Sequence, residues 1–129
     1  MGYRSHVVLA IGKELLPFFM LRLSQNKEAE ALVFSHADHF DRDYQDDKSW
    51  LLRWNSIKWY EGIHGYEDIN CLSRFIEEAA CDQIEFKVNG EEQSSSEHIR
   101  FVRVGEEADD IAVSGYGFED IYVSTHINY

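Results

Sequence analysis

The sequence predicts an α+β fold in which a mainly antiparallel sheet carries two or three helices packed on one face. Two patterns lead to this prediction: strand-like and helix-like segments alternate early in the chain, and a turn signal separates strand-like segments later on. The length of 129 residues suits a single domain, residues 1–129. Hydrophobic residues make up 44% and aromatic residues 14% of the chain, which favours a packed core over intrinsic disorder.

The first part of the chain predicts one strand and two helices. Val7–Ile11 is a continuous apolar segment rich in β-branched residues, which is typical of a buried strand. A helix is expected over residues 13–26, with Pro17 in its first turn, where a missing N–H costs nothing. A second helix is expected over residues 27–36. The apolar positions of the first helix are Leu16, Phe19, Met20 and Leu23.

The middle of the chain predicts a loop, a strand and the most regular helix. Residues 38–48 contain five aspartates without periodicity, so we expect a loop there. Trp50–Tyr60 is expected to be extended, with Trp54 in the core. A turn is expected at Glu61–Gly65. A helix is then expected over residues 68–80, because its apolar residues recur at helical spacing.

The last part of the chain predicts three strands. Gln83–Val88 alternates apolar and charged side chains, and Asn89-Gly90 is a turn signal. We expect Glu91–Ser96 to extend this turn into a longer hairpin loop, after which Ile99–Val104 returns as a strand. Ile121–Ile127 alternates again and is expected to be the final strand.

The two cysteines are expected to be reduced thiols. Cys71 and Cys81 lie ten residues apart in or just after one predicted helix, a separation of about 15 Å that is too long for a disulfide. Small secreted scaffolds usually carry more cysteines at framework spacings. No apolar segment approaches the ~20 residues of a membrane-spanning helix. We therefore expect a cytoplasmic protein.

The charge balance excludes several kinds of partner. Acids outnumber bases 24 to 12, for a formal net charge of −12. A protein that binds nucleic acid directly needs a cationic surface, and so does one that binds an anionic membrane. The imbalance lies outside the N-terminal quarter: residues 1–36 hold four bases and three acids, and residues 37–129 hold eight bases and 21 acids.

The leading hypothesis is that the surplus carboxylates meet on one face. Such a face would imitate the phosphates of a nucleic acid and occupy the basic site of a protein that handles nucleic acid. The alternative is that these acids only keep the protein soluble. Trp59 is left open between the core and a partner surface. The expected partner contacts are Asp41, Asp43, Asp46, Asp47, Glu106, Glu107, Asp109, Asp110 and Trp59.

A metal site is the second hypothesis. His36 and His39 lie three residues apart and would share one face of a helix, with Asp38 and the following aspartates as oxygen ligands. Two imidazoles and a carboxylate suit zinc, manganese or iron. No glutamate stands between the histidines as a general base, and no further ligand pair follows at a telling distance.

Catalysis is not expected. The sequence contains no complete constellation of nucleophile, base and oxyanion donors, and no glycine loop that would cradle a phosphate. We therefore expect neither an enzyme nor a cofactor. A third hypothesis is a homo-oligomeric structural module, such as a homodimer joined through an exposed strand edge.

Three short segments resemble small uncharacterised proteins encoded by bacteriophages and prophages. The first is the opening Met1-Gly2-Tyr3-Arg4-Ser5 before a strand, the second is Ile57-Lys58-Trp59-Tyr60 before a helix, and the third is Phe101–Glu106 followed by Asp109-Asp110-Ile111. The resemblance implies a compact α+β phage accessory protein, and it carries no catalytic residues. Accessory phage proteins often bind and disable a host factor, so the resemblance implies an inhibitor of host defence acting in the bacterial cytoplasm.

Overall fold

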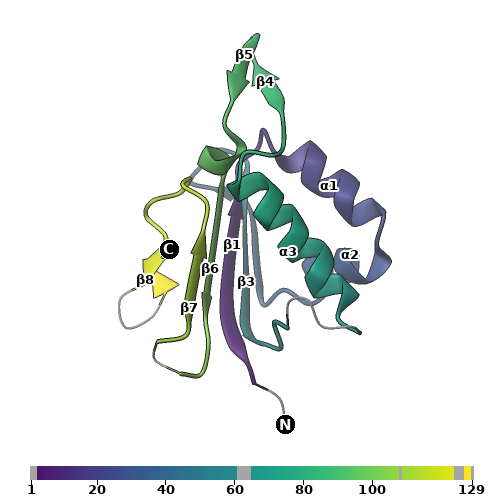
Figure 1. Cartoon of the computed structure of the whole chain (residues 1–129), viewed down its shortest axis with the longest axis vertical. Helices are drawn as coiled ribbons and strands as arrows, with labels where there is room; N and C mark the ends of the chain where they lie inside the picture. The colour runs from purple at the N-terminus through teal and green to yellow at the C-terminus, as the bar shows by residue number, and fades with distance from the viewer. Residues whose placement is uncertain (1–2, 61–64, 108, 124–126, 129) are drawn as a thin grey trace.

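The computed structural model describes residues 3–60, 65–107, 109–123 and 127–128, and it confirms the α+β class. Its main feature is an antiparallel five-stranded sheet in the order β2-β3-β1-β6-β7 (Figure 1). β1 lies at the centre, so its main chain is paired on both sides. The strands of this sheet are β1 (Ser5–Ile11), β2 (His39–Tyr44), β3 (Ser49–Ile57), β6 (Ile99–Val104) and β7 (Ile111–Ser114).

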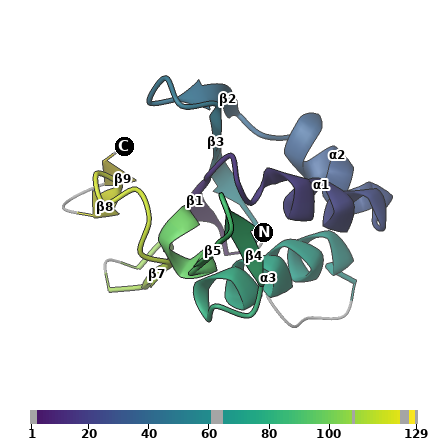
Figure 2. The same ribbon diagram turned by 90° about the horizontal axis from the view of Figure 1, so that it is seen from above.

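Three helices cover one face of the sheet, as predicted. They are α1 (Leu16–Ser24), α2 (Lys27–Phe34) and α3 (Glu67–Ala80). Seen from above, all three lie on one side of the sheet and the C-terminal hairpin lies on the other (Figure 2). This hairpin consists of β8 (Tyr122–Val123) and β9 (Ile127–Asn128).

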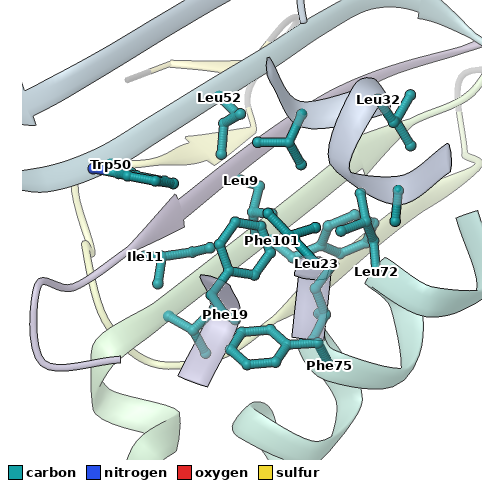
Figure 3. Packing of buried hydrophobic residues seen from close by; sticks show 14 of the residues in the cluster. Leu9, Ile11, Phe19, Leu23, Leu32, Trp50, Leu52, Leu72, Phe75 and Phe101 are labelled. Atoms are coloured by element: carbon teal, nitrogen blue, oxygen red, sulfur yellow. The ribbon is translucent and has the colours of Figure 1, made fainter. Parts of the chain in front are cut away.

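The main hydrophobic core lies between the helices and the sheet. Phe19 of α1 is fully buried, and its ring centroid lies 5.1 Å from that of Phe75 of α3 and 6.2 Å from that of Trp50 of β3. Figure 3 shows these side chains facing Leu9 and Phe101 of the sheet. Alternate residues of β1 point to this side, which explains part of its apolar sequence.

A smaller core on the opposite face explains the rest of that sequence. Val8 and Ala10, the intervening residues of β1, are fully buried beneath the C-terminal segment. A strand buried on both faces has no polar side to present, so it is apolar throughout. The other buried members of this cluster are Leu51, Val102, Ile121 and Ile127.

The helices largely match their predicted positions. Pro17 lies in the first turn of α1, and Asn26 caps α2 by accepting a hydrogen bond from the Ala29 N–H at 3.0 Å. Of the four apolar positions named for this helix, Met20 is the one that does not join the core. Its side chain is 44% exposed because α1 turns only the face of Leu16, Phe19 and Leu23 toward the sheet.

The loop predicted over residues 38–48 was wrong in its first half. His39–Tyr44 forms β2, which pairs with β3 through His39–Arg53, Phe40–Leu52 and Asp41–Leu51. An edge strand in this position keeps charged side chains in solvent, so its sequence lacks the apolar alternation of a buried strand. The turn occupies only residues 45–48.

The predicted long hairpin loop was also wrong. Asn89-Gly90 is a two-residue turn between β4 (Phe86–Val88) and β5 (Glu91–Gln93), so residues 91–93 form a strand. A short 3₁₀ turn, η1 (Ser95–His98), follows them. Ile99–Val104 then pairs with β1 and β7 of the main sheet rather than with residues 83–88.

Two further differences concern the last part of the chain. Ile111–Ser114 forms β7, which we did not predict because four residues give too short a pattern. The final strand predicted over residues 121–127 is divided between β8 and β9. The turn predicted at Glu61–Gly65 lies outside the described residues, apart from Gly65, as do residues 124–126.

Candidate functional site: the acidic surfaces

The turn between β2 and β3 is held by its own aspartates. Asp41 Oδ1 accepts a hydrogen bond from the Asp43 N–H at 2.9 Å, and Asp43 Oδ1 accepts one from the Lys48 N–H at 2.9 Å. Gln45, Asp46 and Lys48 have φ values of +59°, +56° and +57°, a conformation that non-glycine residues adopt uncommonly. Asp41 and Asp43 therefore have a structural role in this turn as well as a negative charge.

Asp47 forms an ion pair with the segment that leaves β1. Lys13 Nζ lies 3.0 Å from Asp47 Oδ1, and both side chains are exposed. The hydrogen bond and the charge of Asp47 raise the pKa of Lys13. An ion pair this exposed contributes little to stability, so its main effect is to cancel part of the local negative charge.

A loop from the far end of the chain brings two more acids to this turn. Gln45 Nε2 donates to Asp120 Oδ2 at 3.3 Å, and the rings of Tyr44 and Phe118 lie 5.9 Å apart. Glu119 and Asp120 are both exposed. We call the resulting surface the acidic end. It consists of Asp41, Asp43, Asp46, Asp47, Glu119 and Asp120, and its neighbouring lysines are Lys13 and Lys48.

The second predicted acidic group surrounds the turn between β6 and β7. Arg103 donates to both carboxylate oxygens of Asp110, from Nη1 to Oδ2 at 3.1 Å and from Nη2 to Oδ1 at 2.9 Å. The Tyr3 hydroxyl donates to Asp110 Oδ2 at 2.7 Å. Hydrogen bonds from Arg103 and Tyr3 lower the pKa of Asp110 to about 2. Asp110 thus connects the N-terminal segment to this turn, and it is not a free contact residue.

The two acidic groups lie at opposite ends of the sheet, so the predicted common face was wrong. The last residues of β2 and of β6 lie at opposite ends of the strands of the sheet, because β2 runs parallel to β1 while β6 runs antiparallel to it. The 7 residues of β1 between the two ends span roughly 20 Å. The Debye length at physiological ionic strength is about 8 Å, so the groups act as separate surfaces. Glu106, Glu107 and Asp109 remain exposed at the second one.

Trp59 belongs to the core, and the prediction of Trp59 as a partner contact was wrong. Its side chain is only 6% exposed. Its ring packs 5.9 Å from Trp54 and 5.5 Å from Phe101. An exposed aromatic anchor and a core aromatic look alike in sequence, and only the position of the strand end distinguishes them.

The histidines do not share a helix face. α2 ends at Phe34, so His36 follows the helix and His39 begins β2. Phe40 faces the main core, so the neighbouring His39 points to the opposite side of the sheet. Asp38 Oδ2 accepts from the Asn55 N–H at 2.8 Å, which joins β3 to the entry of β2. Among the described residues, no three His, Cys, Asp or Glu side chains gather as metal ligands.

Both cysteines are free, as predicted. Cys81 is exposed just after α3, and Cys71 is half-buried within it. Burial raises the pKa of Cys71, although Arg22 and Arg74 partly oppose this effect. A raised pKa makes the thiolate scarce at neutral pH, so Cys71 is a poor nucleophile.

A hollow lies between α3 and the segment joining α1 to α2. It has a volume of about 930 Å³, and its lining is mainly polar. The ion pair from Arg22 Nη2 to Glu78 Oε2, at 2.6 Å, lies against it. Cys71 also lines this hollow.

Comparison of the chain with protein-family models, with curated proteins and with solved structures found no match. Among the helices of the described residues, none is long and apolar enough to cross a membrane. The chemistry of the surfaces is therefore the basis for a functional proposal. Glu119 and Asp120 were not among the expected partner contacts, because no local sequence pattern indicates that they join the turn after β2.

Proposed function

We propose that the protein is a non-catalytic binding protein whose acidic end occupies a cationic site on a nucleic-acid-handling protein of a bacterial host. The observation that carries this proposal is the hydrogen bond from Gln45 to Asp120, because it gathers two acidic segments into one surface. The surface contains six carboxylates, and the cationic residues beside them are Lys13, Arg42 and Lys48. Such a surface steers association with a cationic partner.

Several features of the acidic end support a binding role. Asp46, Asp47, Glu119 and Asp120 are exposed, so their carboxylates are accessible to a partner. The turn that carries Asp46 is held by side-chain hydrogen bonds of Asp41 and Asp43. Carboxylates on an ordered turn lose less conformational entropy on binding than those on a flexible segment.

The resemblance to phage-encoded proteins indicates the biological setting. A phage accessory protein acts in the cytoplasm of a bacterial host, where defence nucleases and their complexes present basic grooves for DNA or RNA. A negatively charged protein surface that fills such a groove competes with the nucleic acid. The proposed activity is thus inhibition of such a host protein by occupation of its nucleic-acid site.

The experiment that tests this proposal compares two variants of equal charge. The acidic-end variant carries Asp46→Asn, Glu119→Gln and Asp120→Asn. The control variant carries Glu77→Gln, Glu91→Gln and Glu92→Gln on exposed positions of α3 and β5. Each variant loses three carboxylates, so the formal net charge changes from −12 to −9 in both.

Immobilised wild-type protein and both variants are exposed to a bacterial lysate at low and at high salt. We expect the wild type and the control to retain the same basic, nucleic-acid-handling protein, and the acidic-end variant to lose it. Added DNA or RNA should release the retained protein. Equal retention by both variants, or retention that is insensitive to salt, would contradict the proposal.

A further inference from the structure

β7 is an open edge of the main sheet. It is the last strand in the order β2-β3-β1-β6-β7 and is paired only with β6 among the strands of the described residues. Figure 2 shows the helices on one side of the sheet and β8 and β9 on the other, with no element drawn alongside β7 at its outer edge. Among the described strands, the outer edge of β7 is therefore unpaired.

The register shows which peptide groups of β7 face outward. In an antiparallel pair, residues alternate between those bonded to the neighbour and those directed away from it. The Gly105 N–H donates to the Asp110 carbonyl at 2.8 Å, which places the bonded positions at Asp110, Ala112 and Ser114. The intervening Ile111 and Val113 thus direct their peptide groups away from β6.

The opposite side of β6 agrees with this assignment. The Gly12 N–H donates to the His98 carbonyl at 2.7 Å. The even-numbered residues of β6 therefore direct their peptide N–H and carbonyl groups toward β1, and the odd-numbered residues direct theirs toward β7. At the start of β7, the Ile111 N–H turns back to the Asp109 carbonyl at 3.1 Å. Within the part of the chain that the structure describes, the groups left for another strand are the N–H and carbonyl of Val113 and the carbonyl of Ile111.

The side chains of β7 differ from those of the other edge strand. Ile111 and Val113 are 44% and 49% exposed, although both are β-branched and apolar. β2, at the opposite edge, carries Asp41, Arg42 and Asp43 and has an irregular register. Charges and bulges protect an edge from further pairing. β7 has neither within its four residues.

Acidic residues flank β7 at both ends, and their negative charge favours a strand with positively charged ends as the partner of β7. Glu106, Glu107 and Asp109 are exposed before the strand. Glu97 lies beyond its other end, because the Gly117 N–H donates to the Ile99 carbonyl and the Tyr116 N–H to the Ser96 carbonyl. Of the nearby arginines, Arg4 donates to the Ser56 carbonyl at 3.3 Å, and two others are also engaged. Arg103 binds Asp110, and Arg100 donates to the Ile121 and Gly115 carbonyls at 3.1 and 2.9 Å.

A second copy of this chain is a poor occupant. A twofold axis would pair β7 antiparallel with β7 of the second copy. The carboxylates that flank each end of β7 would then lie beside the carboxylates that flank the strand of the other copy. Like charges in that arrangement oppose association. An extended segment with basic residues at its ends meets the opposite charge at both positions.

We propose that β7 binds an extended, basic-ended segment of a partner protein as a sixth strand of the sheet. Main-chain hydrogen bonds to Val113 and Ile111 would supply affinity, alternate apolar side chains would pack on their exposed side chains, and the flanking carboxylates would fix the register. This inference rests on the proposed function for the basic character of the partner. Its surface is separate from the acidic end.

The test uses a synthetic peptide of alternating valine and threonine with two lysines at each end. Two matched peptides carry N-methyl groups on one or the other set of alternate amides, so they have the same charge. Binding to the full chain is followed by NMR of the backbone amides. We expect shifts at residues 111–114 with the unmodified peptide. One methylated peptide, whose blocked amides face β7, should bind at least about tenfold more weakly than the other.

Protein variants give an independent measurement. Val113→Thr keeps a β-branched side chain and should bind the peptide, whereas Val113→Lys places a positive charge on the edge and should not. Equal binding of both methylated peptides, or shifts confined to residues 41–47, would overturn the inference, because charge alone would explain them. A dimer of the wild type that Val113→Lys disperses would also overturn it. The acidic-end variant should bind the peptide normally, so failure of the proposed function and failure of this inference are distinguishable.

Discussion

Gln45 donates a hydrogen bond to Asp120, a residue 75 positions away, at 3.3 Å. The contact joins the turn after β2 to the loop before β8. This turn lies at the β2 edge of the sheet, opposite to the edge that β7 forms. Each segment is acidic on its own, and together they form the acidic end. A surface assembled from distant segments depends on the fold, so unfolding should abolish it.

Lys13 moderates the charge of the acidic end, and its removal should strengthen binding. Lys13→Gln breaks the ion pair with Asp47 and leaves that carboxylate unopposed. We expect faster association with the partner captured from lysate, with little change in the free energy of unfolding, because the pair is exposed. Stopped-flow association at several salt concentrations measures this effect. A slower association rate for Lys13→Gln would contradict the assignment of the interface.

Asp110 should contribute stability that depends on pH. Its pKa is lowered from 3.8 to about 2 in the folded protein, so its charge favours folding above about pH 4, and this contribution is lost as the pH falls through 2. Asp110→Asn should therefore destabilise the protein at neutral pH and have a much smaller effect near about pH 2. Urea unfolding of the two proteins across this range is the measurement. A difference that stays constant with pH would show that the carboxylate is not paired as described.

Trp54 should be important for holding α2 against the sheet. Its indole N–H donates to the Leu32 carbonyl at 3.1 Å, and the side chain is only 2% exposed. Trp54→Phe keeps an aromatic ring but leaves a carbonyl in the last turns of α2 without this donor. We expect a loss of about 1–3 kcal/mol in the free energy of unfolding. Leu21→Ala, at an exposed position of α1, is the control and should change it by less than about 0.5 kcal/mol.

The two thiols should differ in reactivity. Cys81 is exposed, whereas Cys71 is half-buried with a raised pKa. We expect a thiol reagent to modify Cys81 first at neutral pH, because Cys81 is exposed whereas burial shields Cys71 and raises its pKa, and we expect the rate at Cys71 to rise as the pH is made alkaline. Mass spectrometry of timed samples identifies each site. Equal rates at both residues would mean that α3 is less well packed than the structure indicates.

The buried elements could be predicted from the sequence because their patterns are local. The central strand is continuously apolar from Val7 to Ile11, and the amphipathic helix ending at Ala80 repeats its apolar residues at helical spacing. β2 could not be predicted in this way, because its edge position leaves charged residues exposed on it. β7 is too short for a pattern to emerge.

The distribution of charge was the least predictable feature, because it depends on strand order. The aspartates after His39 and the acids after Val104 are equally acidic in sequence, but the antiparallel arrangement of β6 and β1 sends the second group to the opposite end. No local pattern indicates that Asp120 approaches Gln45. Trp59 was ambiguous for a related reason: its burial depends on where β3 ends beneath the helices.

Carboxylate footprinting tests the central claim most directly. The protein is labelled with a carbodiimide and an amine, alone and in complex with the partner captured from lysate, and each modified acid is quantified by mass spectrometry. We predict that binding protects Asp46, Asp47, Glu119 and Asp120 from labelling while Glu77, Glu91 and Glu92 react as before. Unchanged labelling of the acidic end in the complex would contradict the account.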